Sequence, residues 1–478
     1  MNTRKIISSF AFKFIERISA KSIGLVIGIV LARLLSTETF GLLAIITVFV
    51  NLAQSFVQSG MGTALVQNKT TEEGDYSTVF WFSLGIATAF CGILWMAAPL
   101  ISRFYGYEEL IWPLRVMTLA LPVGALSSVQ NAKLQREMQF KKTMYCNLAA
   151  VVLAGAIGIA AAYAGLELWA LVIYNLSYGA LSAIILLLIG EWHPHRIFSF
   201  QRVKVFWSYG WKLLVSGLLC SLYNDIRSLI VAKRFAVSDL AVYDKGKQYP
   251  EVIAMTMDNA IQTVMLPVMS EQQDERERMK GMMLTSQGMS VFIGTPLMLG
   301  MAAIAQTLIP LLLTEKWSGS IPYMVLFCIS YVMLPMQMSN LNLIKAMGRS
   351  DLYMKLEMIR RIVMIAILAV VVLCFHSVYA IAVSFLVSSV IDTLIIMLAI
   401  KRIIGLPLSQ QGRSVWKSIL SGAIMALAVS AMNALALPLI CKLLLQILSG
   451  AVIYSICSAC LKAEPLLYMA DILKKLKK

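Results

Sequence analysis

The sequence predicts an all-α polytopic membrane protein with about fourteen transmembrane helices. Composition is the first observation: 59% of the 478 residues are hydrophobic, only 14% are charged, and the mean hydropathy is +0.77. A water-soluble domain of this composition would expose a large apolar surface. Patterning is the second: apolar stretches of the ~20 residues that a spanning helix needs recur along the whole chain. Only short charged connections separate them, so no large soluble domain is expected.

The first predicted span is a retained helix rather than a cleaved signal peptide. Its apolar run is interrupted by Lys13, Glu16, Arg17 and Lys21, and no small-residue cleavage pattern follows. The predicted spans cover residues 6–35, 40–65, 77–101, 111–131, 144–164, 167–189, 205–232, 239–268, 283–313, 321–344, 352–374, 377–400, 415–435 and 438–461.

Basic residues predict the orientation of the chain. Lys and Arg concentrate in the connections that face the same side as the N-terminus, such as Lys141–Lys142 and Arg276–Lys280, and in the tail after the last span. The positive-inside rule therefore places both termini in the cytoplasm. These loops account for the net charge of +16, and nucleic-acid binding is not expected.

An internal similarity at a spacing of about two hundred residues predicts two related lobes. The segment LARLLSTETFGLL, residues 31–43, is echoed by VAKRFAVSDLAVY, residues 231–243. An even number of spans separates the copies, so both have the same orientation. We predict an N-terminal six-helix lobe over 1–200 and a C-terminal six-helix lobe over 201–403 around a central cavity. Two further helices and a basic tail then follow over 404–478.

Cysteines do not indicate a metal or cofactor site. All eight lie within or at the edges of predicted spans, so neither a disulfide framework nor an aqueous metal site is expected. Cys457 and Cys460 form a C-x-x-C pair, which we interpret as two small residues packed in the last span.

Charged residues inside predicted spans are the candidate functional groups. At bilayer depth each costs at least ~2.5–3.5 kcal/mol on insertion scales, so it normally faces a partner or a water-filled cavity. Lys13, Arg17 and Lys21 follow one face of the first helix at i, i+4 and i+8, a cationic stripe suited to a diphosphate or acidic sugar. Snorkelling of Lys13 and pairing of Arg17 with Glu16 are the structural alternative.

A second group of charges occupies the seventh and eighth spans. Arg227, Lys245 and Lys247 are candidate substrate-binding bases, and each lies ~9–12 Å from the outer end of its helix, so they can meet at one depth. Glu251 and Asp258 are candidate sites for a coupling H⁺ or Na⁺, although Lys247 at i−4 from Glu251 offers a competing ion pair. Because acids and bases are nearly balanced here, a purely structural network remains open.

Polar residues elsewhere suggest two further interpretations. Asn51, Gln54 and Gln58 share one face of the second span, which suits sugar hydroxyls or, equally, hydrogen bonds between helices. Glu357 with Arg361, and Asp392 at a depth similar to that of Arg360, are interpreted as structural ion pairs.

Several blocks resemble one known family. LARLLSTETFGLLAIITVFVNLAQSFVQSGMGTALVQNK, YDKGKQYPEVI and LLLTEKWSGSIPYMVLFCIS are similar to the lipopolysaccharide, colanic acid and O-antigen exporters of the multidrug/oligosaccharidyl-lipid/polysaccharide flippase superfamily. Matching blocks extend from residue 20 to 400, and DKGKQYP is more charged than the usual version of its block.

The resemblance implies a flippase of the bacterial cytoplasmic (inner) membrane. Such proteins carry undecaprenyl-pyrophosphate-linked oligosaccharides to the outer leaflet by alternating access, so lipid-linked oligosaccharide, membrane lipids and other polysaccharide-assembly proteins are the implied partners. A cation-coupled drug exporter, a membrane-embedded polymerase or glycosyltransferase, and a non-transporting scaffold are the alternatives. The drug exporter should have a less cationic cavity, and the enzyme should need a larger extramembrane loop or an exposed acidic metal site.

Overall fold

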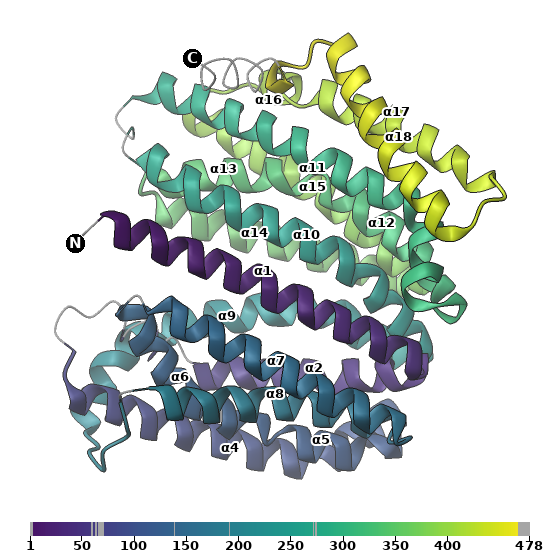
Figure 1. Ribbon diagram of the computed structural model, residues 1–478. Coiled ribbons are helices and arrows are strands. Elements are labelled where there is room, and N and C mark those ends of the chain that lie inside the picture. The colour runs from purple at the N-terminus through teal and green to yellow at the C-terminus, as the bar shows by residue number, and fades with distance from the viewer. Residues whose placement is uncertain are drawn as a thin grey trace. The chain divides into compact units, whose positions relative to one another are not determined.

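The computed structural model describes residues 3–58, 61, 62, 65, 71–137, 139–190, 192–270, 272 and 275–466. These residues form helices and connections, and no strand occurs among them (Figure 1). The side chains of some of these residues lie outside what is described, namely those of residues 3–18, 58, 205, 208–210, 212, 213, 216, 219, 220, 259, 260, 263, 264, 266, 267, 270, 276 and 350. The chain divides into two compact units, Met1–Ala241 and Val242–Lys478. The lobes predicted over 1–200 and 201–403 are inferred from a sequence repeat, whereas these two units are defined by packing. The predicted lobe boundaries therefore stay a prediction.

The first unit is a bundle of long helices with one interrupted helix. Its helices are α1 (Thr3–Leu34), α2 (Thr37–Gln58), α4 (Glu73–Tyr105), the short η1 (Glu108–Leu110), α5 (Ile111–Met117), α6 (Ala120–Arg136), α7 (Phe140–Tyr163), α8 (Leu168–Ile189) and α9 (Phe200–Arg234).

The second unit begins within a long helix and has a comparable composition of elements. Its helices are α10 (Val237–Ser270), α11 (Arg276–Leu313), η2 (Glu315–Ser320), α12 (Ile321–Tyr331), α13 (Leu334–Ala346), α14 (Ser350–Cys374), α15 (Val378–Ile404), α16 (Leu408–Arg413), α17 (Trp416–Ala431), η3 (Met432–Ala434) and α18 (Leu439–Cys460).

Ten helices or interrupted helices among the described residues are long and apolar enough to span a membrane. They confirm an all-helical, multi-span fold, while the count of fourteen spans stays a prediction. The other four predicted spans correspond to α1, α9, α10 and α14, which are 25 to 35 residues long. These helices carry the intramembrane charges found in the sequence, and that charge is what lowers their apolarity.

Proline explains why two spans are interrupted at matching places in the two units. The break between α5 and α6 falls at Thr118 and Leu119, shortly before Pro122, and the break between α12 and α13 falls shortly before Pro335. A proline has no N–H to donate and its ring clashes with the carbonyl one turn earlier, so the helix is broken there.

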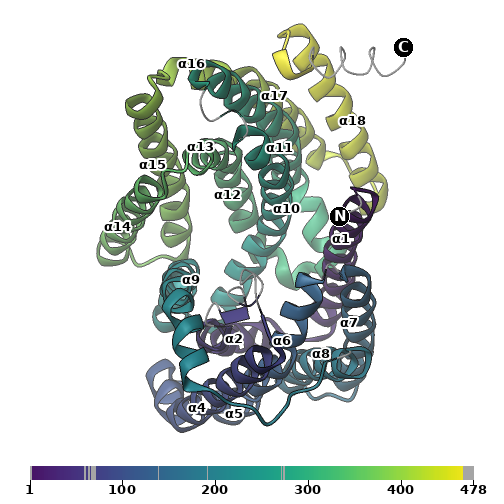
Figure 2. The ribbon, with the colours of Figure 1, turned by 90° about the vertical axis from the view of Figure 1, so that its left-hand side faces the viewer.

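Small residues on α7 allow the first unit to pack closely. A Cβ on Gly155 would lie 2.2 Å from Cδ1 of Ile27 on α1, and one on Gly158 would lie 2.7 Å from Cβ of Tyr174 on α8. Figure 2 accordingly shows α1, α7 and α8 side by side. Close approach at small residues is the usual way for helices to associate inside a bilayer.

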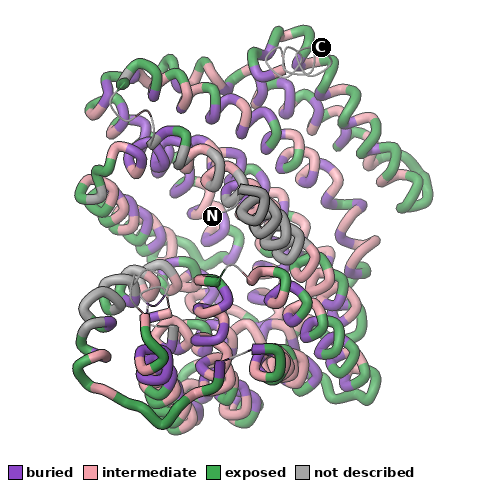
Figure 3. Tube along the Cα trace, turned by 60° about the vertical axis from the view of Figure 1, so that its left-hand side comes forward, coloured by how far each residue is buried: buried purple, intermediate pink, exposed green. Residues whose placement is uncertain are grey.

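In the second unit α11 contacts α12, α13, α17 and α18 (Figure 2). A Cβ on Gly422 of α17 would lie 2.3 Å from Cγ2 of Thr295 on α11, so this crossing is also close. The opposite face of α18 contains the exposed apolar residues Ile440, Leu444 and Leu448. Figure 3 shows exposed residues in green along the trace. An apolar outer face suits contact with lipid tails.

Candidate functional site

The cationic stripe of α1 is only partly described. Lys21 is exposed on α1. Lys13 and Arg17 lie on the same helix, but their side chains are outside the described residues. The predicted role of this stripe in binding a diphosphate or acidic sugar therefore stays a prediction.

The first unit brings the polar face of α2 against α9. The Oγ atoms of Ser55 and Ser221 are 3.3 Å apart, which fixes the register of the two helices. Arg227 lies six residues further along α9 and is buried, with its guanidinium 5.5 Å from the ring centre of Tyr223. Because the two helices run in opposite directions, a rise of 1.5 Å per residue puts the exposed Asn51 within about 3 Å of the level of Arg227.

The three residues of the predicted amide face of α2 do not share one environment. Gln54 is half-buried against α6, where a Cβ on Gly124 would come within 2.4 Å of Nε2 of Gln54. Asn51 is exposed, and the side chain of Gln58 lies outside the described residues. Gln54 thus has the surroundings of a residue that packs between helices, whereas Asn51 remains accessible to a ligand.

Gly246 explains the charged DKGKQYP block in α10. A Cβ here would lie 2.6 Å from Cβ of Tyr323 and 2.8 Å from the carbonyl of Ser320, so only glycine permits this close approach of α10 to η2 and α12. The neighbouring Lys245 is buried. Its Nζ is 3.1 Å from Oε1 of Gln248 and 5.7 Å from the ring centre of Trp317.

Lys247 and Glu251 form the local ion pair that the sequence offered as a competing explanation. Nζ of Lys247 lies 3.8 Å from Oε2 of Glu251, one turn along α10. Both side chains are partly exposed, at 16% and 35%. The pair is therefore accessible to solvent, and an exposed ion pair of this kind is weak enough for either charged group to bind a ligand instead.

Asp258 has different surroundings from Glu251 although both are on α10. It is buried, and Nε2 of Gln262 donates a 2.6 Å hydrogen bond to its Oδ2. Its Oδ1 has no hydrogen-bond partner among the described residues. Asp258 lines a cavity of about 10 Å³, beside the break between α12 and α13. A cavity of roughly this size holds the centre of one water molecule.

The cavity beside Asp258 is otherwise mostly apolar. The residues that line it with Asp258 are Ala254, Met257, Ile261, Gly294, Met298, Tyr331, Leu334 and Pro335. The charged group that acts electrostatically on Asp258 is Lys345 of α13. Among the lining residues, Asp258 has the one carboxylate, and the hydroxyl of Tyr331 is the other titratable group.

The ion pairs interpreted as structural lie together in the second unit. Arg360 of α14 donates two hydrogen bonds to Asp392 of α15, and both residues are buried. Its Nη1 also donates a 2.8 Å hydrogen bond to Glu357, which lies 3.4 Å from Arg361. These contacts link α14 to α15 and leave Arg360 enclosed, as expected of a structural network.

A charged cluster at the start of α4 was not predicted from the sequence. Arg202 at the start of α9 lies 2.8 Å from Glu72 and 2.7 Å from Asp75, and hydrogen bonds to these carboxylates raise its pKa. The local signal was present, because Glu72 and Asp75 form a reciprocal capping box. Their partner is 127 residues away from Asp75, and local sequence patterns carry no information about it.

These features define a multi-pass helical membrane protein that encloses charged side chains within its spanning helices, an arrangement typical of transporters. The family model described as "Polysaccharide biosynthesis protein" matches residues 30–322, more than half of the chain. The chain therefore belongs to this family, which confirms the resemblance seen in the sequence.

Two relatives and one solved structure show the extent of the similarity. The succinoglycan biosynthesis transport protein ExoT of Rhizobium meliloti is 22% identical over 70% of this chain and 67% of its own length. The lipopolysaccharide biosynthesis protein WzxC of Escherichia coli is 23% identical over 74% of this chain and 73% of its own. The fold is similar to that of the lipid II flippase MurJ in an inward closed conformation, with a TM-score of 0.75 and 13% identity over 98% of this chain and 100% of that chain.

Proposed function

We propose that this protein is a flippase that moves undecaprenyl-pyrophosphate-linked oligosaccharide units across the bacterial cytoplasmic membrane by alternating access. The observation that carries the proposal is the family match over 30–322 in a chain with charged, membrane-spanning helices. The transport function in the name of ExoT and the likeness of the fold to a lipid flippase support it. In this reading the chain moves its substrate unchanged and needs no catalytic group or cofactor.

The cationic residues divide into two roles. Arg227 and Lys247, with Lys13, Arg17 and Lys21 of α1, would bind the pyrophosphate or acidic sugars, because charge-assisted hydrogen bonds strengthen in a low-dielectric cleft. Lys245 is covered by Trp317 and Gln248, so we assign it to holding α10 against η2. Asn51 is exposed at the level of Arg227 and is suited to sugar hydroxyls, while Gln54 and Gln58 stay candidates for the same surface.

We further propose that transport is coupled to protons at Asp258 rather than to Na⁺. A hard cation needs several oxygen ligands, whereas the cavity at Asp258 has one carboxylate, mostly apolar walls and room for about one water. A proton needs only the unpartnered Oδ1. Glu251 is the weaker candidate, because its carboxylate lies 3.8 Å from Nζ of Lys247, whereas no ion pair with Asp258 occurs among the described residues.

In this proposal both termini lie in the cytoplasm, and other proteins of polysaccharide assembly deliver and receive the lipid-linked substrate. The basic connections of the sequence support that orientation through the positive-inside rule.

The test is deletion of the gene in its host, followed by identification of the lipid-linked oligosaccharide that accumulates on the cytoplasmic leaflet. Accumulation of one such intermediate, with loss of the surface polysaccharide, is expected. Restoration by the intact chain but not by Arg17→Ala, Arg227→Ala or Lys247→Ala would support the assigned residues. Normal surface polysaccharide in all three variants would contradict the site, and normal polysaccharide in the deletion strain would contradict the function.

A further inference from the structure

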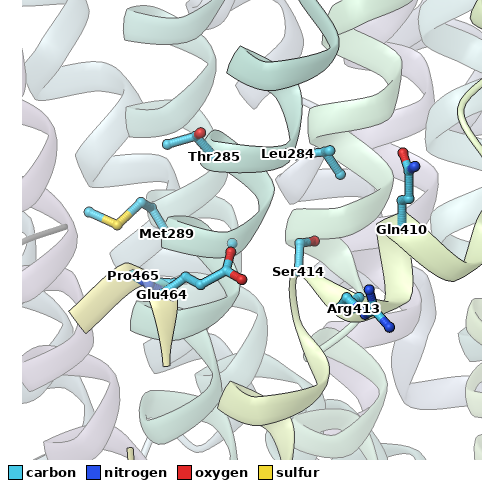
Figure 4. Close-up of a pocket in the computed structure, with 9 residues that line it drawn as sticks. Leu284, Thr285, Met289, Gln410, Arg413, Ser414, Glu464 and Pro465 are labelled. Carbon is cyan, nitrogen blue, oxygen red and sulfur yellow. The ribbon is translucent and has the colours of Figure 1, made fainter. Parts of the chain in front are cut away.

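The second unit contains a larger pocket, and none of the proposed transport residues lines it. Its volume is about 360 Å³, within the range of roughly 300–1,000 Å³ typical of small-ligand sites. Its walls come from α11, α16 and the segment that follows α18 (Figure 4). It is lined by Leu284, Thr285, Gly288, Met289, Gln410, Arg413, Ser414, Glu464 and Pro465.

Buried hydrogen bonds hold the short α16 in place. Nε2 of Gln287 on α11 donates to the carbonyl of Gln411, 3.2 Å away. Nε2 of Gln411 in turn faces the carbonyls of Met397 and Leu406 at 3.4 and 3.3 Å. Ser414 donates a 2.8 Å hydrogen bond to the carbonyl of Gln411. The wall that presents Arg413 is therefore fixed to both α11 and α15.

The opposite wall is held by a strained turn after α18. Lys462 has a φ of 48°, a left-handed conformation that non-glycine residues seldom adopt, and Nζ of Lys417 donates a 3.0 Å hydrogen bond to its carbonyl. This turn brings Glu464 and Pro465 back towards α11. A Cβ on Gly288 would lie 3.3 Å from the carbonyl of Ser414 and 3.6 Å from Cγ of Pro465, so the floor of the pocket lies close to both walls.

The pocket presents two opposite charges that do not pair with each other. Arg413 and Glu464 are both exposed, and neither has an ion-pair partner among the described residues. Figure 4 shows them on either side of Ser414, Glu464 from the segment after α18 and Arg413 from α16. A ligand that carries an anionic and a cationic group would complement both, whereas a simple anion would meet the Glu464 carboxylate.

The depth of the pocket points to a membrane lipid. The 38 residues of α11 extend for about 57 Å, whereas the hydrocarbon core of a bilayer is ~30 Å thick. With the middle of α11 placed at the middle of the core, about 13 Å of the helix projects beyond the core at each end. Leu284 and Gly288 lie roughly 12 and 18 Å from the start of α11, at the boundary between core and headgroups. Trp416, two residues after Ser414, is 47% exposed, and tryptophan is enriched at this boundary.

We propose that this pocket binds the headgroup of a phospholipid that carries a phosphate and a primary ammonium, as in phosphatidylethanolamine. Arg413 binds the phosphate, which suits a guanidinium, and Gln410 and Thr285 offer further polar contacts. Glu464 accepts hydrogen bonds from the ammonium. The bound lipid joins α11 to the end of α18, a role that goes beyond the proposed transport function and does not depend on it.

The test measures lipid retention by the purified full chain. The chain is equilibrated with detergent micelles that contain equal amounts of phosphatidylethanolamine, phosphatidylcholine and phosphatidylglycerol with the same acyl chains, and bound lipid is counted by native mass spectrometry. Preferential retention of phosphatidylethanolamine is expected. Arg413→Gln should lower that retention roughly two- to fivefold, the range for a partly exposed charge pair. Glu464→Gln should abolish the preference over phosphatidylglycerol.

Matched variants separate this pocket from general surface charge. Arg402→Gln removes another exposed arginine, in the last turn of α15 and outside the pocket, and should leave retention unchanged. Gly288→Leu keeps both charges but fills the pocket, and should also lose the lipid. Equal retention of the three lipids by the intact chain, or equal losses in Arg402→Gln and Arg413→Gln, would overturn the proposal. Displacement of the lipid by soluble glycerophosphoethanolamine would overturn its assignment to a membrane lipid.

Discussion

Gln262 donates a 2.6 Å hydrogen bond to Oδ2 of Asp258, a residue that lines a water-sized cavity, while Oδ1 of the same carboxyl group has no hydrogen-bond partner among the described residues. One oxygen is thus held in place, while the other is available to take up or release a proton. Glu251, two turns away on the same helix, instead lies beside Lys247. This contrast agrees with the sequence, which offered Lys247 as a competing ion-pair partner for Glu251 and named none for Asp258.

Asp258→Asn should uncouple transport from a proton gradient. The amide is nearly isosteric and can keep a contact with Gln262, but it cannot exchange a proton. We expect substrate movement in proteoliposomes to lose its response to an imposed pH gradient. The measured quantity is the amount of lipid-linked oligosaccharide that becomes accessible at the outer surface of the proteoliposomes. Glu251→Gln is the matched control and should retain the response. An unchanged response in Asp258→Asn, or a stimulation by Na⁺ without a pH gradient, would contradict proton coupling.

Breaking the Arg360–Asp392 pair should destabilise the second unit. Asp392→Leu leaves a buried guanidinium with one carboxylate fewer, and removal of one partner from a buried ion pair typically costs about 3–5 kcal/mol. The expected result is a lower thermal midpoint of the purified protein in detergent. The double variant Arg360→Met with Asp392→Leu should recover most of the loss, since no uncompensated charge remains. Equal midpoints for the single variant and the intact chain would show that the pair is not structural.

A side chain at Gly41 should disturb the junction between α2 and the start of α10. A Cβ there would lie 2.0 Å from the carbonyl oxygen of Val237, and a backbone atom cannot move aside as a flexible side chain can. Gly41→Ala is therefore expected to cost about 1–3 kcal/mol, as overpacking usually does. The comparison is Gly28→Ala, where no atom lies within 4 Å of the added Cβ. Similar yields and thermal midpoints for both variants would contradict the close approach.

Lys245 and Lys247 should respond differently to loss of their charge. Lys245→Met keeps the length of a buried side chain packed near Trp317, so export should fall little. Lys247→Met removes an accessible charge and should reduce export at least tenfold, if the lysine makes a charge-assisted hydrogen bond worth ~1.5–3 kcal/mol in transport. Surface polysaccharide measured at matched protein levels checks both. Greater damage from Lys245→Met than from Lys247→Met would reverse the two assigned roles.

Much of the fold could be predicted because spanning a bilayer is a local property. Length and apolarity of a segment decide whether it spans, so each predicted span falls, over its described residues, on a helix or on a helix interrupted shortly before Pro122 or Pro335. The interruptions themselves were not predicted, although proline was visible. Whether a proline bends, breaks or merely begins a helix depends on what the neighbouring helices can supply to the freed backbone groups.

The sequence by itself determined that charges lie within spanning helices and which of them are one turn apart, as in Lys247 with Glu251. Helical periodicity fixes such neighbours without any tertiary information. Only the tertiary structure decided which helices face each other. It joined Arg360 to Asp392, covered Lys245 with Trp317, and placed Asp258 beside a cavity. It also brought Arg413 and Glu464 into one pocket, because packing between distant segments depends on shape and not on local pattern.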